Sequence, residues 1–170
     1  MNPKLDHLFA RRSVRRYQDR PVAEELLTDL LQAAMAAPSA VGKDPWHFIV
    51  VRDREVLEAI PRASPYASMT RHADVAVVVC GILALEKHPG FWVQDCSNAA
   101  MNILNAAHAL GLGAVWTAAW PMEDRATALS ALLGIPEGVV PLCVIPIGHP
   151  KKPLDPGQRF EADRIHRDRW

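Results

Sequence analysis

One stretch of this 170-residue chain is continuously apolar, and it limits the possible folds more than any other feature. After Asp74, the six residues Val75–Cys80 are all apolar and mostly β-branched, which is typical of a strand covered on both faces. We expect this strand to be central, between two other layers. Strand and helix patterns alternate through the rest of the body, so the sequence predicts an α/β or α+β layer fold in one domain.

Apolar residues three and four positions apart predict helices on both sides of this strand. The expected helices are Leu5–Ala10, a helix between Pro21 and Pro38, Asp53–Ile60, Trp92–Leu110 and Glu123–Leu133. Asp53 is the expected N-cap of its helix. The helix Trp92–Leu110 is the longest, and its many alanines would let another element approach closely, so we expect it to be a central or an interface helix.

Three further segments have the pattern of strands, and one is expected to be a loop. The strands are His47–Val51, Gly113–Trp120 and Val139–Ile147, and the loop is Pro61–His72. Pro141 and Pro146 interrupt the last strand, and proline cannot donate a ladder hydrogen bond. We therefore expect this strand not to be fully paired along both of its sides.

The 19 basic and 19 acidic residues balance, so no overall field would attract nucleic acid or an anionic membrane. No apolar run reaches the roughly 20 residues that span a bilayer, and the first residues lack the apolar stretch of a signal peptide. We expect a cytoplasmic protein. The histidines show no metal-ligand spacing, so no metal site is predicted. Cys80, Cys96 and Cys143 lie far apart in apolar segments and are expected to be reduced core residues.

Basic residues are concentrated at the two ends of the chain, above all in Arg11-Arg12-Ser13-Val14-Arg15. Guanidinium groups bind phosphate oxygens through paired hydrogen bonds, and a serine hydroxyl can add another. In an extended segment, alternation would place Arg11, Ser13 and Arg15 on one side. These residues leave two interpretations open, a phosphate site or a solvated basic stretch. The loop between Ala36 and Trp46 is similarly either a rigid turn or the wall of a site.

Five motifs, taken in order, resemble the nitroreductase family of FMN-dependent NAD(P)H oxidoreductases. They are Arg11-Arg12-Ser13-Val14-Arg15, Ala37-Pro38-Ser39, Pro45-Trp46-His47-Phe48, the segment from Ala107 to Gly113, and Ile145-Pro146-Ile147-Gly148-His149-Pro150. The resemblance implies an α+β fold of three layers, with a central, mainly antiparallel sheet flanked by helices. It also implies an intertwined homodimer with one FMN in each of two interface clefts, and the whole chain, residues 1–170, as one FMN-binding domain.

The resemblance assigns site residues by position. Arg11, Arg12 and Ser13 would meet the FMN phosphate and ribityl chain, and Arg15 the pyrimidine edge. The other subunit would supply Pro38, Ser39 and Ala40. Arg159 would close on the phosphate from a C-terminal arm, residues 149–170, that crosses to the partner. The remaining expected contacts lie around the flavin ring: Gly42, Tyr66, Met69, Trp116, Thr117, Ala118 and Ala119.

The reaction implied is a ping-pong hydride transfer through flavin N5, from NAD(P)H to a nitroaromatic, quinone or enone. A backbone N–H near Ala118 would orient the ring, and no side-chain base is required. Two departures from the family pattern matter. Gly42 and Asp44 stand where many members have asparagine and glutamine, and alanines 118 and 119 replace an acidic residue and a glycine. The changes at Gly42 and Asp44 motivate an alternative, a flavin-binding carrier or sensor without reductase turnover.

Overall fold

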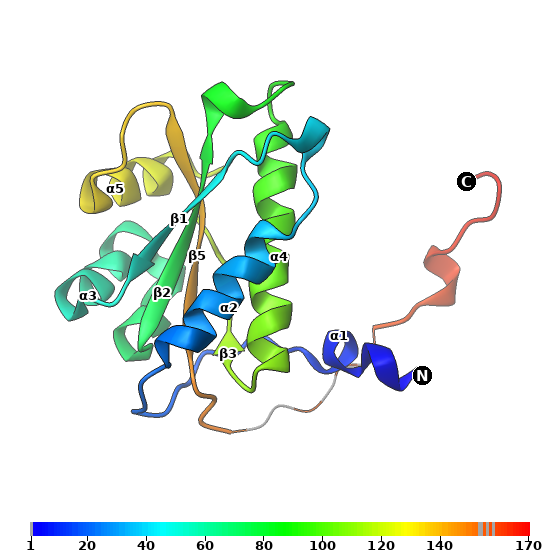
Figure 1. Ribbon diagram of the computed structural model, residues 1–170, viewed down its shortest axis with the longest axis horizontal. Helices are drawn as coiled ribbons and strands as arrows, with labels where there is room; N and C mark the ends of the chain where they lie inside the picture. Colours follow the sequence, from blue (N-terminus) through cyan, green and yellow to red (C-terminus); the bar gives the residue numbers. More distant parts are fainter. Residues whose placement is uncertain (1, 153–154, 156, 158) are drawn as a thin grey trace.

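A computed structural model describes residues 2–152, 155, 157 and 159–170. At its centre is an antiparallel sheet with helices on both faces (Figure 1). Its strands are β1 (Trp46–Val51), β2 (Val75–Ile82), β3 (Gly113–Ala114), β4 (Thr117–Ala118) and β5 (Val139–Gly148). The order across the sheet is β1-β2-β5-β3, and β4 also pairs with β5. The three-layer α+β fold implied by the resemblance is therefore confirmed.

Helices cover both faces of the sheet (Figure 1). The α-helices are α1 (Asp6–Ala10), α2 (Glu24–Met35), α3 (Arg54–Ala63), α4 (Phe91–Ala109) and α5 (Glu123–Leu133). One face carries α2 and α4, and the other carries α3 and α5. Short 3-10 helices occupy Pro3–Leu5, Ala40–Gly42, Pro65–His72, Leu83–Leu85 and Ala162–Arg164. The expected helices are thus all present, and the Asp53 side chain accepts a hydrogen bond from the Val56 N–H as the predicted N-cap.

Strand β2 divides the hydrophobic core into two parts, as its uninterrupted apolar sequence predicts. Val75, Val77 and Val79 pack in one cluster with α2 and α4, whereas Val78 and Cys80 pack in the other with α3 and α5. Side chains alternate between the faces of a strand, so both sets must be apolar when both faces are covered. The strand lies between β1 and β5, which confirms its central position.

The expected loop from Pro61 to His72 is instead mostly helical. Helix α3 continues through Pro61 to Ala63, and a 3-10 helix then runs from Pro65 to His72. Proline has no N–H, so at this position it leaves the carbonyl of Leu57, four residues earlier, without its helical partner. The Thr70 hydroxyl donates to that carbonyl at 2.9 Å. Thr70 is thirteen residues from Leu57 along the chain, so this hydrogen bond is not apparent from the local sequence. It allows α3 to continue beyond Pro61, where the sequence alone predicts that the helix ends.

The predicted strand from Gly113 to Trp120 is two short strands, β3 and β4, separated by Val115 and Trp116. Both pair with β5, at residues 147–148 and 143–144. The other side of β5 pairs with β2 along nearly its whole length. Pro141 and Pro146 lie outside the two short ladders, so the expectation of incomplete pairing on one side is confirmed, although β5 is not an edge strand.

The chain ends in an arm that leaves the body of the molecule (Figure 1). Residues 153, 154, 156 and 158 of the expected arm 149–170 lie outside the described residues. Within the described part, Phe160 is 82% exposed and Trp170 is fully exposed. Nothing in the described chain buries these two side chains, and exposed apolar side chains of this kind often mark an interaction surface. Among the described residues, no helix is both long enough and apolar enough to cross a membrane.

Candidate functional site

The segment from Ser13 to Tyr17 is extended and fixed along the edge of the sheet. Ser13 forms a parallel bridge with Ala114, and the Val14 N–H donates to the Ala114 carbonyl at 3.0 Å. The Tyr17 hydroxyl lies 2.8 Å from the carbonyl oxygen of Val14 and is buried. Burial raises the pKa of the Tyr17 phenol, so this hydroxyl stays a donor. At Gly113 a Cβ would lie 2.6 Å from a Val14 methyl carbon, so the close approach requires glycine there.

Three arginines from the two ends of the chain meet just before this segment. The pKa of Arg11 is lowered by burial, and further by the charges of Arg159 and Arg12. Arg12 also donates to the Asp155 carbonyl at 2.6 Å, which ties it to the arm. Among the described residues, no carboxylate lies within ion-pair distance of these three side chains. An uncompensated guanidinium cluster is the donor set that a phosphate group requires.

The end of α4 adds a histidine to this cluster. Burial lowers the pKa of His108, and the charges of Arg11 and His7 lower it further. A bound anion would oppose the effect of Arg11 on the His108 ring. The sequence-predicted residues Arg11, Arg12 and Arg159 are therefore brought together within one chain, with Ser13 following them on the fixed segment.

The predicted second group, Pro38, Ser39, Ala40 and Gly42, lies in the loop between α2 and β1, at the other end of α4. The backbone is left-handed at Val41, Gly42 and Asp44, with φ of 58°, 62° and 46°. A β-branched residue such as valine is rarely stable in that region, and such strain persists where the surroundings hold it. The Ser39 hydroxyl donates to the Asp44 carboxylate. Hydrogen bonds within the loop therefore hold its shape, and the exposed Asp44 is bonded to Ser39 through both its carboxylate and its N–H.

Asp95 holds this loop and is a functional candidate that the sequence interpretation missed. It lies on α4, is only 4% exposed, and accepts a hydrogen bond from the Ala40 N–H at 2.9 Å. Asn98 and Asn102 follow it on the helix and donate to carbonyl oxygens of residues 38 and 33. The polar residues 95, 98 and 102, spaced three and four positions apart on one side of the helix, are the signal that could have identified this clamp.

We expect Asp95→Ala to free the loop. A hydrogen bond to a charged group contributes roughly 1.5–3 kcal/mol, so the Ala40 amide should exchange with solvent about ten to a hundred times faster. Hydrogen exchange followed by NMR measures this directly. Gln94→Ala is the control, because Gln94 is exposed on the same helix turn. Unchanged exchange at Ala40 in the Asp95 variant would exclude the clamp.

The residues predicted to lie around the flavin ring differ in how deeply their side chains are buried. Met69 is buried beside Tyr17, and Trp116 is half-buried against the main core. Tyr66 is 71% exposed, and the Arg125 guanidinium carbon lies 4.9 Å from its ring centre. Burial raises the pKa of the Cys80 and Cys96 thiols to about 12, so these thiols do not supply a nucleophile.

Strand β4 contributes backbone groups rather than side chains. The Thr117 hydroxyl donates to the Val144 carbonyl, and the Ala119 N–H donates to the Leu142 carbonyl at 2.9 Å. Successive N–H groups of a strand point to opposite sides. By this alternation we expect the Ala118 N–H to point away from β5, whereas the Ala119 N–H is already bonded to Leu142; a ring donor in the Ala118–Ala119 region stays a prediction.

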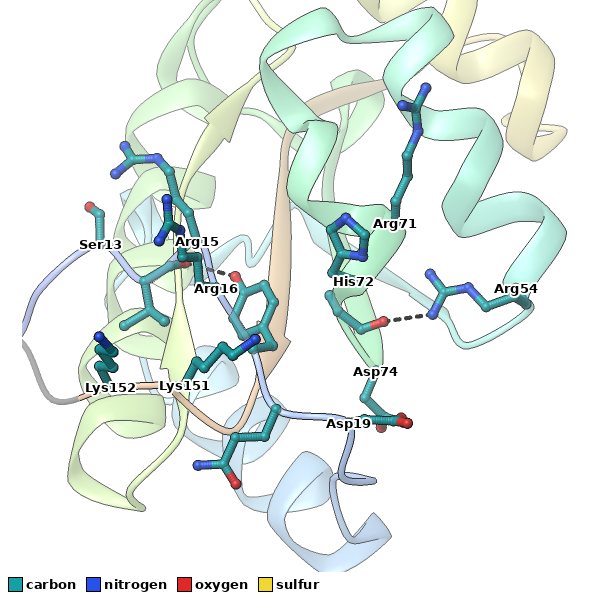
Figure 2. A pocket seen from close by; sticks show the side chains of 14 residues that line it. Ser13, Arg15, Arg16, Asp19, Arg54, Arg71, His72, Asp74, Lys151 and Lys152 are labelled. Carbon is teal, nitrogen blue, oxygen red and sulfur yellow. Dashed lines mark hydrogen bonds between the residues drawn. The ribbon is translucent and has the colours of Figure 1, made fainter.

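A pocket of about 1000 Å³ opens beside the fixed segment (Figure 2). Its size is at the upper end of the roughly 300–1,000 Å³ usual for small-molecule sites. The lining comes from the fixed segment, the end of the 3-10 helix, α3 and the start of the arm: Ser13, Val14, Arg15, Arg16, Tyr17, Gln18, Asp19, Arg54, Arg71, His72, Ala73, Asp74, Lys151 and Lys152. Of the predicted residues, Ser13 and Arg15 line it.

Several basic residues of this pocket were missed by the sequence interpretation. Arg71 and His72 directly follow Met69 and Thr70 in the segment expected to be a loop, and Lys151 and Lys152 begin the arm. Their charges were visible in the sequence. What was not visible is the pairing of Tyr17 with Pro150, which brings the arm alongside the fixed segment.

Known proteins resemble this chain over nearly its full length. A protein of Methanothermobacter thermautotrophicus, provisionally named NADH dehydrogenase/NAD(P)H nitroreductase, is 56% identical over 168 residues, covering 98% of this chain and 87% of its own. A crystal structure with the same provisional name from Parabacteroides distasonis has a TM-score of 0.95 at 40% identity and full coverage of both chains. A crystal structure of a protein of Desulfovibrio desulfuricans, provisionally named a nitroreductase and in complex with FMN, has a TM-score of 0.87 at 31% identity, covering 100% of this chain and 99% of its own. Residues 8–149 match the sequence model of the nitroreductase family, and the chain belongs to that family.

Proposed function

We propose that this protein is an FMN-dependent NAD(P)H oxidoreductase that reduces small electron-poor acceptors. The observation that carries the proposal is the uncompensated cluster of Arg11, Arg12 and Arg159, which directly precedes Ser13, a residue that lines a ligand-sized pocket. The names of the relatives support the same cofactor and the same class of enzyme. Nitroaromatics, quinones and enones are the acceptor classes that the family resemblance suggests.

The residues of the cluster fit the phosphate of FMN. Arg11 is half-buried next to two like charges, a position that favours an anion strongly. Arg11, Arg12 and Arg159 would hold the phosphate through charge-assisted hydrogen bonds, and the Ser13 hydroxyl would add another. When bound there, FMN would supply the hydride-transfer chemistry between NAD(P)H and the acceptor.

The two predicted halves of the site require two copies of the chain. Ala40 contacts α4 at Asp95, whereas Arg11 lies near His108 on the same helix. Thirteen helical residues separate these points, which is about 20 Å at 1.5 Å per residue. One chain therefore does not bring both groups to one small ligand. A homodimer in which the loop of one copy faces the arginines of the other would do so, and the exposed arm offers a route between them.

Within this site, Arg15 would tune the electronics and β4 would orient the ring. Arg15 lines the pocket two residues beyond Ser13, so it would reach further along the cofactor than the phosphate. A fixed positive charge there would stabilise the negative charge that the cofactor gains on reduction. The Ala118 N–H, which we expect to point away from β5, would be available as a donor to the ring. No side-chain proton donor or acceptor is needed for hydride transfer.

Anaerobic reduction tests the proposal. Purified protein should be yellow with bound FMN, and NADH or NADPH should bleach the colour when oxygen is excluded. Adding a quinone or nitroaromatic should restore it. A yellow protein that neither dinucleotide bleaches would instead support a flavin carrier or sensor, the function motivated by the changes at Gly42 and Asp44. A colourless protein that does not take up FMN would contradict both functions.

We expect Arg15→Gln to lower the midpoint potential of bound FMN. The substitution keeps hydrogen bonding and removes the positive charge. That charge stabilises the reduced form of FMN, which is the more negative one, so its removal disfavours reduction. For a two-electron couple about 30 mV corresponds to 1.4 kcal/mol, so a decrease of some tens of millivolts is expected. Spectroelectrochemical titration measures it, with Arg20→Gln as a control for net charge. Equal potentials in wild type and Arg15→Gln would show that Arg15 does not face the ring.

A further inference from the structure

The pocket beside Arg15 carries more positive charge than a flavin ring requires. Six arginine and lysine side chains line it, against the carboxylates of Asp19 and Asp74 (Figure 2). The Asp74 carboxylate is already engaged, since it accepts from Arg52 at 2.7 Å and from the Val22 N–H at 2.9 Å. We propose that these cations bind the 2′-phosphate of the electron donor, so that the enzyme prefers NADPH to NADH. This inference rests on the proposed function.

Backbone hydrogen bonds hold two of the basic segments together. The Lys151 N–H donates to the Arg16 carbonyl at 3.0 Å, and the Gln18 N–H donates to the His149 carbonyl at 2.8 Å. The Gln18 side chain adds a bond to the Pro150 carbonyl at 2.7 Å. Like charges repel, so a ladder that fixes Arg16 next to Lys151 creates a site whose repulsion an anion would relieve.

Across the pocket, one arginine is engaged by the protein and another is not. Arg54 donates to the carbonyls of Thr70 and Ala73 at 2.8 and 2.9 Å, so its guanidinium is fixed against the end of the 3-10 helix. Arg71 lines the same pocket and is exposed, and the hydrogen bonds and ion pairs of the described residues do not include its side chain. Arg71 and Lys151 therefore supply charge from opposite walls.

A phosphate monoester is the chemistry that this arrangement fits. It carries a charge of about −1.5 to −2 at neutral pH and several strong acceptor oxygens. NADPH and NADH differ only in such a group, on the adenosine ribose. The cluster of Arg11, Arg12 and Arg159 is expected to be filled by the phosphate of FMN. The basic side chains of the pocket, including Arg71 and Lys151, are thus available to the second phosphorylated molecule of the reaction, the electron donor.

Binding of adenosine 2′,5′-bisphosphate and of 5′-AMP tests the proposal without turnover. By calorimetry on the FMN-loaded protein, we expect the bisphosphate to bind at least tenfold more tightly. Arg71→Gln and Lys151→Gln should each reduce this preference severalfold, and high salt should reduce it as well, because exposed charges are screened. Arg62→Gln is the matched control, since it removes one exposed charge from α3 outside the pocket lining.

Equal affinity of the wild type for the two nucleotides would overturn the proposal. So would an equal loss for both nucleotides in Arg71→Gln, which would assign the cations to the 5′-phosphate. A loss of FMN affinity without a matching loss for riboflavin in that variant would assign them to the cofactor. Stopped-flow reduction adds a kinetic comparison, in which NADPH should exceed NADH in kcat/KM. If neither dinucleotide reduces the flavin, the proposed function fails, while the binding ratio still decides the 2′-phosphate site.

Discussion

Arg11→Ala is expected to weaken FMN binding by about tenfold to a hundredfold and to leave riboflavin binding nearly unchanged. The change removes a charge-assisted contact of roughly 1.5–3 kcal/mol to the phosphate, which riboflavin lacks. Arg11 is half-buried, and its pKa is lowered first by this burial and then by the charges of Arg159 and Arg12. Without a bound anion, removing the Arg11 guanidinium relieves its repulsion with the other two arginines. With FMN bound, the same change removes its attraction to the phosphate.

Fluorescence titration of the apoprotein with each flavin measures both affinities. Arg20→Ala is the matched control, because Arg20 is an exposed arginine of the same basic segment. Arg20→Ala should leave the affinities for FMN and for riboflavin nearly unchanged, because it removes only one charge distant from the phosphate. Equal losses for FMN and riboflavin in Arg11→Ala would place the cluster away from the phosphate.

The His108 ring gives an independent readout of the same cluster. Its pKa is lowered first by burial and then by the charge of Arg11. Removing that charge in Arg11→Ala should raise the pKa of His108 toward its ordinary value. Adding FMN to the wild type should raise it too, because the phosphate offsets the guanidinium charge. NMR titration of the His108 ring protons resolves both shifts.

Patterns that depend on neighbouring residues predicted most of the fold. The unbroken apolar run of β2 gave a strand covered on both faces, because alternate residues then pack on opposite helix layers. The helix periodicity of α2, α4 and α5 likewise located them to within a few residues. The secondary structure was predicted wrongly at 61–72 and at 113–120, where contacts with residues distant in sequence determine the backbone conformation. Thr70 completes the hydrogen bonding around Pro61, and the pairing of β3 and β4 with β5 breaks the third predicted strand at Val115.

Candidate site residues could be predicted where they are adjacent in one segment. They could not be predicted where the fold brings distant segments together. Arg11, Arg12 and Ser13 are adjacent in sequence, so they could be recognised together as a candidate phosphate site, with a solvated basic stretch as the alternative. Asp95 acts on a loop more than fifty residues away, and Arg71 and Lys151 line one pocket only because the fold brings their segments to it. The assignment of Arg159 came from the family resemblance, and the structure places that residue beside Arg11.

Deleting residues 153–170 is expected to weaken both the homodimer and FMN binding. Truncation after Lys152 keeps the pairing of Tyr17 with Pro150 but removes Arg159 from the arginine cluster. It also removes the exposed apolar side chains of the arm, including Phe160 and Trp170. If these side chains lie against a partner, the loss should be large, because permanent dimers bury more than about 2,000 Å² of largely apolar surface.

Two smaller changes separate the two effects of this deletion. Arg159→Ala should reduce FMN affinity at least tenfold and leave the dimer intact, because it removes only a phosphate contact. Deleting residues 165–170 should weaken the dimer while Arg159 remains. Light scattering at micromolar concentration gives the mass of each form against the 18.8 kDa of one chain. A wild-type protein that is monomeric under these conditions, yet binds FMN with full affinity, would show that one chain completes the site and that the arm does not cross to a partner.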